Sequence, residues 1–290
     1  MNTPEDEAAA EPTSTVEPIV PGETQAFHSV PRGGFRAVRV RIRALARLAA
    51  FALATIGLSA WFFLVAPATL GSPARRTRLR NAVFRRWAVV SLAAVGVRVT
   101  VRGRPPAGPC FLISNHIVYA DIWLLASQTS AVFVAESGIA RWPFFGFMAR
   151  VLDIIFVDRL NNRTLPVVNA RMEEAFARGH VVAIFPEGRT GPGTVVLPFR
   201  TSLLEPPARH GHPIAWATIG YTTGPDDPPP SQAVRWPDGM SVAKHAAKFL
   251  LLDRIDATLT FGEGTVRGSN RKALAEDLHR RVASSFEPLA

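Results

Sequence analysis

The chain of 290 residues contains a single cysteine, Cys110. One thiol excludes an intramolecular disulfide framework and a cysteine-rich zinc site, and we interpret Cys110 as a small core residue. Charged residues are also scarce at 19%, whereas hydrophobic residues make up 48%. This composition excludes a chain that is disordered throughout, and the length suffices for one large domain or two small ones.

Lysine and arginine are absent from residues 1–26, which hold six acidic residues. This stretch has no apolar period, so we predict a disordered acidic tail over residues 1–34. The rest of the chain carries 33 basic against 17 acidic residues, a net charge of +16. A body this basic favours an anionic partner. Nucleic acid, an anionic membrane surface and an acidic carrier protein are the candidates.

Charge is missing altogether from Leu48 to Ala74, a run of 27 residues. About 20 apolar residues span a bilayer core as a helix, and a buried soluble helix rarely runs this long without a polar face. We therefore predict a membrane-embedded helical anchor within residues 35–86. Six arginines precede the run and six follow it. A simple span carries its excess positive charge on one side, so two alternatives stay open: a single span, or a segment that enters an anionic membrane face and returns.

Residues 87–290 show strand patterns that alternate with helical patterns. This order predicts an α/β domain with a mostly parallel central sheet flanked by helices. The apolar stretch 141–152 is interpreted as a groove wall or a second membrane contact. Strands are predicted at 97–101, 110–116, 131–137, 154–159, 180–188, 213–221 and 256–264, and helices at 121–128, 166–179, 241–252 and 271–286.

The segment "SNHIVYADIW" holds the first candidate for chemistry, His116 and Asp121. Histidine is the usual base for an alcohol at neutral pH, and a carboxylate on its second ring nitrogen stabilises the imidazolium. On one regular helix the two side chains would point about 140° apart. They can meet only if His116 precedes the helix and Asp121 lies in its first turns, where the helix dipole also favours a neutral imidazole.

Three further segments lie at predicted strand ends. "FPEGRTGPG" runs from Phe185 to Gly193, and its backbone amides and Arg189 could hold an anion, while Glu187 could accept from a hydroxyl or amine. "FVDR" ends in Arg159, which could bind a phosphate or carboxylate. "VLPF" contains Pro198 and by itself indicates only a turn. Each of the three also fits an ordinary surface turn or ion pair.

Taken in order, the four segments resemble the glycerolipid acyltransferase family, the 1-acylglycerol-phosphate acyltransferases and their relatives. The resemblance covers residues 95–220 and implies that His116 is the general base and Asp121 its orienting partner. It implies an acceptor site and an acyl-donor side formed by the substrate-binding candidates Asn115, Arg159, Glu187, Gly188, Arg189, Thr190 and Pro198.

One departure from the family pattern lies in the third segment. The family reads F-P-E-G-T-R-S, whereas here Gly188 is followed by Arg189 and then Thr190. In an extended turn this shift points the arginine the other way, which argues against a direct contact between Arg189 and a phosphate. The stretches "FVAESGIARWPFFGFMARVLDIIFVDR" and "VLPFRTSLLE" are similar to the branch that acylates lyso-ornithine lipid, whose head group carries a carboxylate and an amine.

The resemblance implies a lysolipid O-acyltransferase on the cytoplasmic face of the inner membrane. The acceptor is 1-acyl-glycerol-3-phosphate or lyso-ornithine lipid. The donor is an acyl thioester of acyl carrier protein or of CoA, and no further cofactor is expected. A thioester is already activated, so no nucleophile elbow is required, and none is present. The alternative is a non-catalytic, basic membrane-binding protein with the same fold.

We expect neither nucleic acid nor metal as a partner. No aromatic platform for single strands accompanies the basic residues. His210 and His212 alternate as if on a strand, but no cysteine or carboxylate cluster accompanies them in the sequence.

Overall fold

The computed structural model describes residues 34–141, 146, 149, 151–158 and 161–290. Apart from Gly34, the predicted acidic tail lies outside the described residues, as do Arg159 and much of the apolar stretch 141–152.

The centre of the molecule is a seven-stranded sheet with the order β1-β7-β6-β2-β5-β3-β4. Neighbouring strands are parallel except β6 and β7, which pair antiparallel. The predicted mostly parallel α/β sheet is therefore confirmed. Its strands are β1 Val97–Arg102, β2 Cys110–Ser114, β3 Val132–Glu136, β4 Ile155–Val157, β5 Val181–Ile184, β6 Ile214–Thr223 and β7 Ile255–Phe261.

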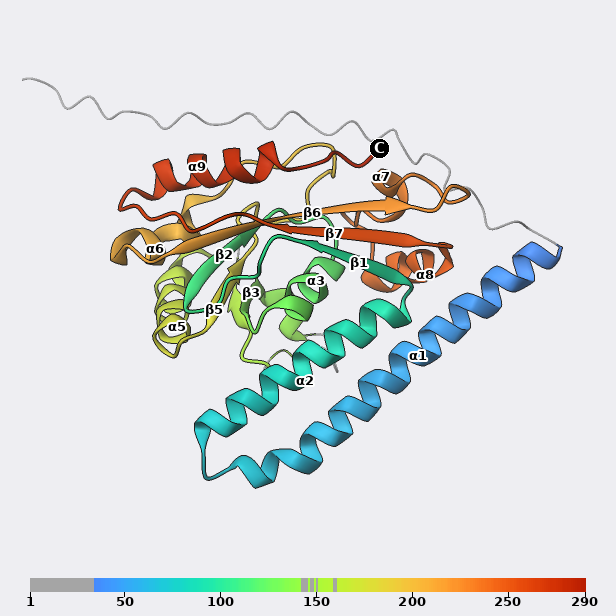
Figure 1. Cartoon of the computed structure of the whole chain (residues 1–290), viewed down its shortest axis with the longest axis horizontal. Helices are drawn as coiled ribbons and strands as arrows, with labels where there is room; N and C mark the ends of the chain where they lie inside the picture. Colours follow the sequence, from blue (N-terminus) through green and yellow to red (C-terminus); the bar gives the residue numbers. More distant parts are fainter. Residues whose placement is uncertain (1–33, 142–145, 147–148, 150, 159–160) are drawn as a thin grey trace, which may run out of the picture.

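Helices cover both faces of this sheet, because alternate residues of each buried strand face opposite layers. Leu112 of β2 and Ala183 of β5 join one core cluster, and their neighbours Ile113 and Ile184 join the other. The first layer contains α2 Pro73–Ala94, α3 Ala120–Gln128 and α8 Val242–Leu251, and the second contains α5 Leu165–Ala177, α6 Glu205–His210 and α9 Arg271–Ser284 (Figure 1).

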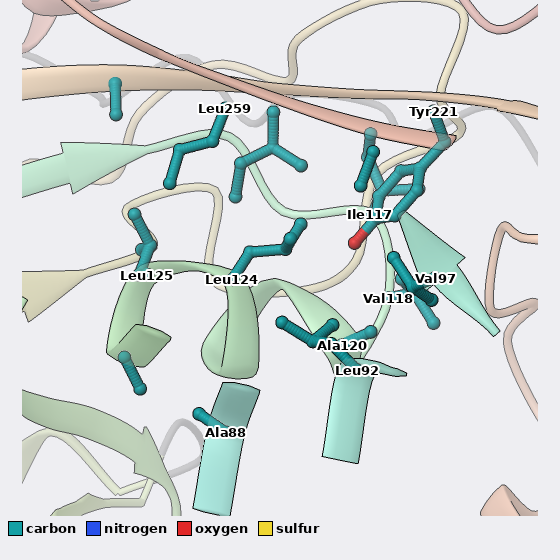
Figure 2. Close-up of a cluster of buried hydrophobic side chains, with 14 of the residues drawn as sticks. Ala88, Leu92, Val97, Ile117, Val118, Ala120, Leu124, Leu125, Tyr221 and Leu259 are labelled. Carbon is teal, nitrogen blue, oxygen red and sulfur yellow. The ribbon is translucent and has the colours of Figure 1, made fainter. Parts of the chain in front are cut away.

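The first cluster surrounds the segment that links β2 to α3. Ile117, Val118 and Ala120 are almost completely buried there, against Leu124 of the following helix. Figure 2 shows Tyr221 extending from β6 into this cluster with its hydroxyl among these side chains. The packing fixes the backbone that carries the candidate site.

The charge-free run forms part of a helical hairpin. Helix α1 covers Phe35–Val65, a short turn of helix covers Ala66–Thr69, and α2 begins at Pro73, where the hydroxyl of Ser72 accepts a hydrogen bond from the Arg75 amide. The helix from Phe35 to Thr69 is long and apolar enough to cross a membrane, and only 11% of its apolar window is buried. Along the C-terminal part of α1, helix α2 lies between α1 and the rest of the molecule (Figure 1).

Helix α1 is also attached directly to the α/β domain. Arg47 donates to the carbonyl oxygens of Leu250, Leu252 and Asp253 at the end of α8, and Arg43 donates to that of Leu251. Guanidinium groups at this position satisfy carbonyls that the helix end leaves unpaired. The hairpin is therefore attached to the α/β domain through side-chain contacts of α1 as well as through the chain connection from α2 to β1.

The prediction that His210 and His212 alternate along a strand is wrong. His210 ends α6, and Gly211 follows with a φ of 62° as its left-handed cap. The His212 Nε2 lies 2.8 Å from a carboxylate oxygen of Glu173 on α5. This pair joins α5 to the segment before β6 and has a structural role.

Candidate active site

Four neighbouring parallel strands end at one edge of the sheet, and each is followed by polar residues. His116 lies two residues after β2, Glu187 three residues after β5, Glu136 is the last residue of β3, and Asp158 follows β4 directly. The carboxyl edge is where open α/β sheets bind their ligands. The order β2-β5-β3-β4 thus brings side chains from separate parts of the sequence to one edge.

The His116 and Asp121 side chains meet as the strand–loop–helix argument requires. His116 precedes α3, and Asp121 lies in the first turn of that helix. The Nδ1 of His116 lies 2.8 Å from Oδ2 of Asp121, whose side chain is fully buried. A buried carboxylate on Nδ1 selects the imidazole tautomer in which Nε2 is able to accept a proton.

Three other groups hold the Asp121 carboxylate. Its Oδ2 accepts from the amides of Ile117 at 2.6 Å and Val118 at 2.9 Å. Its Oδ1 accepts from the Tyr221 hydroxyl at 2.6 Å. Burial, together with the charge of Asp121, raises the pKa of Tyr221 well above its ordinary value, so Tyr221 remains a donor. These bonds compensate for the cost of burying the carboxylate.

The imidazole of His116 opens into a cleft of about 90 Å³. On one side its ring stacks on Phe185, with centroids 4.2 Å apart. Ligand pockets commonly measure about 300–1,000 Å³, so this cleft encloses only the part of a ligand that reaches His116. Its polar lining comprises His116, Glu136, Asp158, Gly188, Arg200 and Ser202.

Glu187 lies behind the cleft and not in it. Its Oε1 accepts from the His116 amide at 2.8 Å and its Oε2 from the Leu197 amide at 3.1 Å, and only 4% of the residue is exposed. Burial raises the pKa of Glu187 to about 7, against the lowering effect of these two amides. The Gly191 amide donates to the His116 carbonyl at 2.6 Å. The loop after β5 therefore holds the backbone of His116 on both sides.

Four other candidates occupy different surroundings. Asn115 is buried, and its amide group exchanges two hydrogen bonds with the backbone of Ile219 on β6. Thr190 donates to the Trp236 carbonyl at 3.3 Å, and Arg189 lies 3.6 Å from a carboxylate oxygen of Asp238 at the surface. These contacts do not direct Asn115 or Arg189 into the cleft. Pro198 is exposed to solvent and does not line the cleft. Gly188, with a φ of 72°, does line the cleft.

Sequence reasoning missed three residues of this site. Tyr221 continues the alternation of Ala217 and Ile219, whose side chains face α3 from β6. This alternation was the sequence signal that Tyr221 carries its hydroxyl into the core. Glu136 is a carboxylate at the end of a buried strand, the same signal that singled out "FVDR". Arg200 follows "VLPF" by one residue, but nothing local to the sequence indicates which way it points.

A mostly parallel α/β sheet with this constellation at its carboxyl edge is an acyltransferase fold. A family model described as "Acyltransferase" matches residues 97–219. The structure of the 1-acyl-sn-glycerophosphate (LPA) acyltransferase PlsC from Thermotoga maritima is similar, with a TM-score of 0.62 over 87% of this chain and 99% of that chain, at 18% identity.

Curated relatives extend the match along the sequence. The lyso-ornithine lipid O-acyltransferase of Rhizobium meliloti (strain 1021) is 30% identical over 211 residues, 68% of this chain and 72% of the relative. The 1-acyl-sn-glycerol-3-phosphate acyltransferase of Neisseria gonorrhoeae is 28% identical over 167 residues, 57% of this chain and 65% of the relative. The chain belongs to the glycerolipid acyltransferase family.

Replacing Tyr221 with Phe tests the support of Asp121. The change leaves Oδ1 of a buried carboxylate without its hydroxyl donor, so we expect a loss of about 1–3 kcal/mol in the free energy of unfolding. Denaturant titration measures this loss. The other tyrosine supplies a control: the Tyr119 hydroxyl makes a longer contact, 3.3 Å to His245, so Tyr119→Phe should cost less. Equal losses in the two variants would contradict the assignment.

The raised pKa of Glu187 predicts a pH-dependent stability. Between its ordinary value of 4.5 and about 7, the folded chain retains a proton that the unfolded chain has released. The stabilisation is therefore complete below pH 4.5 and is lost as the pH rises to about 7. We expect the unfolding free energy of the wild type, minus that of Glu187→Gln, to fall as the pH rises from 4.5 to about 7. For the control Glu276→Gln, at an exposed position, the same difference should not change with pH. A difference that rises with pH would refute the expected shift.

Proposed function

We propose that the protein is a lysolipid O-acyltransferase in which His116 is the general base and Asp121 its orienting partner. The observation that carries the proposal is the 2.8 Å contact between His116 Nδ1 and a fully buried Asp121, beside a cleft that His116 lines. With Nδ1 held by a carboxylate, Nε2 is the nitrogen available to take a proton from the acceptor.

The reaction transfers an acyl group from a thioester to a lipid hydroxyl. The hydroxyl oxygen forms a bond to the thioester carbonyl carbon while Nε2 of His116 takes its proton. The carbon–sulfur bond then breaks, and the departing sulfur takes the proton back from the imidazolium. The products are an ester and a free thiol, and His116 returns to its neutral form. Asp121 stabilises the imidazolium between the two proton transfers.

The acceptor is lyso-ornithine lipid or 1-acyl-glycerol-3-phosphate, and the donor is an acyl thioester of acyl carrier protein or of CoA. Named relatives of both acceptor types match this chain, which supports the choice of acceptors. The net positive charge of the body after residue 26 favours both an anionic membrane and an acidic carrier. No cofactor is required by the reaction, because the thioester supplies the activation.

We further propose that the α1–α2 hairpin, which contains the predicted anchor of residues 35–86, lies in the membrane surface and does not span the bilayer. Thr55 on α1 accepts a hydrogen bond from Trp87 on α2, and Phe51 contacts Trp123 on α3. A span perpendicular to the membrane would pull these residues away from the α/β domain. The exposed Arg75 and Arg76 lie just beyond the hairpin tip, where anionic head groups would bind them.

This arrangement places the α/β domain of residues 87–290 at the membrane surface, within reach of the lipid acceptor. We assign it to the cytoplasmic face of the inner membrane, in keeping with the arginines at both ends of the charge-free run. The aliphatic side chains on the outer face of α1 would then enter the lipid. Leu53 and Leu64 are 71% and 80% exposed.

His116→Ala distinguishes an enzyme from a non-catalytic membrane-binding protein. We expect acyl transfer to fall by at least about 100-fold, the usual contribution of a general base, while expression and membrane binding persist. The assay incubates membranes with each acceptor and each donor and identifies the product by mass. His210→Ala, at the opposite edge of the sheet, should leave the rate unchanged. Transfer at a near-normal rate by purified His116→Ala would disprove the mechanism.

Glutamate at position 53 or 64 tests the membrane hairpin. Burying a leucine is worth about 1.5–3 kcal/mol, so Leu53→Glu or Leu64→Glu should weaken binding to phosphatidylglycerol vesicles by at least about tenfold. Val167→Glu is the matched control, because Val167 is 64% exposed on α5. Vesicle flotation measures the bound fraction. If all three variants bind as tightly as the wild type, the outer face of α1 does not enter the membrane.

A further inference from the structure

Two carboxylates end neighbouring strands beside His116. Glu136 closes β3 and pairs in register with Val157, the last residue of β4, so Asp158 lies one residue beyond that pair. Both residues line the same cleft as the imidazole. Gly138 leaves room for the first carboxylate: a Cβ there would lie 2.5 Å from Oε2 of Glu136.

Arg200 lines the same cleft and adds a positive charge to its wall. Its amide donates to the Pro186 carbonyl at 2.8 Å, which fixes its backbone beside the loop after β5. The side chain crosses Gly188, where a Cβ would lie 2.8 Å from its Nε. Within the part of the chain that the structure describes, no carboxylate forms an ion pair with Arg200.

The cleft around His116 therefore has walls of both charges. A head group with a phosphate would bring about two negative charges close to Glu136, and like charges at short range repel. A head group with one ammonium and one carboxylate has a partner for each of its charges. Charge-assisted hydrogen bonds of this kind are about twice as strong as neutral ones.

We propose that Glu136 binds the ammonium, and Arg200 the carboxylate, of a zwitterionic lysolipid, and that this subsite selects it over a phosphate-bearing acceptor. The inference rests on the proposed O-acyltransferase function and specifies its acceptor. Glu136 and Arg200 do not take part in proton transfer. They position the acceptor so that its hydroxyl faces His116.

The experiment compares kcat/KM for lyso-ornithine lipid and for lysophosphatidate with purified full-length protein and one acyl donor. We expect the wild type to prefer lyso-ornithine lipid. Glu136→Gln should reduce kcat/KM for that acceptor by about tenfold or more, the effect of losing a hydrogen bond to a charged group, and should not reduce it for lysophosphatidate. The exposed Glu276→Gln is the control for the loss of one carboxylate and should match the wild type.

A second acceptor keeps the test informative if Glu136→Gln folds poorly. Acetylation of the side-chain amine of lyso-ornithine lipid removes its ammonium and leaves its carboxylate and hydroxyl. The wild type should use the acetylated acceptor about tenfold less well, and folded Glu136→Gln should discriminate less between the two. Arg200→Gln should lower kcat/KM for unmodified and for acetylated lyso-ornithine lipid, because both lipids carry the carboxylate.

The outcomes separate the subsite from the function itself. Equal wild-type use of the acetylated and unmodified acceptors, or a wild-type preference for lysophosphatidate, overturns the subsite while acyl transfer stands. An equal fall for both lipids in Glu136→Gln also overturns it, because that result indicates a general structural role. Absence of transfer to any acceptor by the wild type overturns the proposed function and the subsite together.

Discussion

The buried carboxylate of Asp121 is the interaction on which the site depends. It is fully buried and accepts four hydrogen bonds, from His116, from the amides of Ile117 and Val118, and from Tyr221. An unpaired charge at this depth would be costly. The same bonds that compensate for its burial fix the loop after β2 and the orientation of the imidazole, so the stability of this region and the geometry of the base have one origin.

The sheet supplies the rest of the site through its strand order. Because β2, β5, β3 and β4 are parallel neighbours, their carboxyl ends form one edge. The segment after β5 serves two purposes there: Glu187 holds the His116 backbone from behind, and Gly188 lets Arg200 approach the cleft. Buried hydrogen bonds therefore form the back of the site, and solvent-accessible charges form its opening.

Local patterns predicted the strands of the sheet and the helices α3, α5, α8 and α9, but not α6. They also predicted the His116–Asp121 pair, because strand, loop and helix in that pair are consecutive in the sequence. Contacts between distant segments were not predictable. Tyr221 reaches Asp121 across 100 residues, and Arg47 caps a helix more than 200 residues away. The burial of a polar side chain was also not predictable from the sequence. Glu187 is polar and follows a strand, which predicted a substrate contact, yet both of its carboxylate oxygens accept hydrogen bonds from backbone amides.

Aromatic contacts connect the hairpin to the segment that carries the site. Phe51 of α1 contacts Trp87 of α2 and Trp123 of α3, and Trp123 contacts Tyr119, two residues before Asp121. Aromatic contacts of this type are worth about 0.5–1.5 kcal/mol each beyond their burial, so the series joins α1 firmly to the first turn of α3. If the hairpin lies in the membrane surface, this attachment holds the cleft at a fixed height above the lipid. A lysolipid could then present its hydroxyl to His116 while its acyl chain remains in the membrane, which agrees with a cleft that encloses only the part of a ligand that reaches His116.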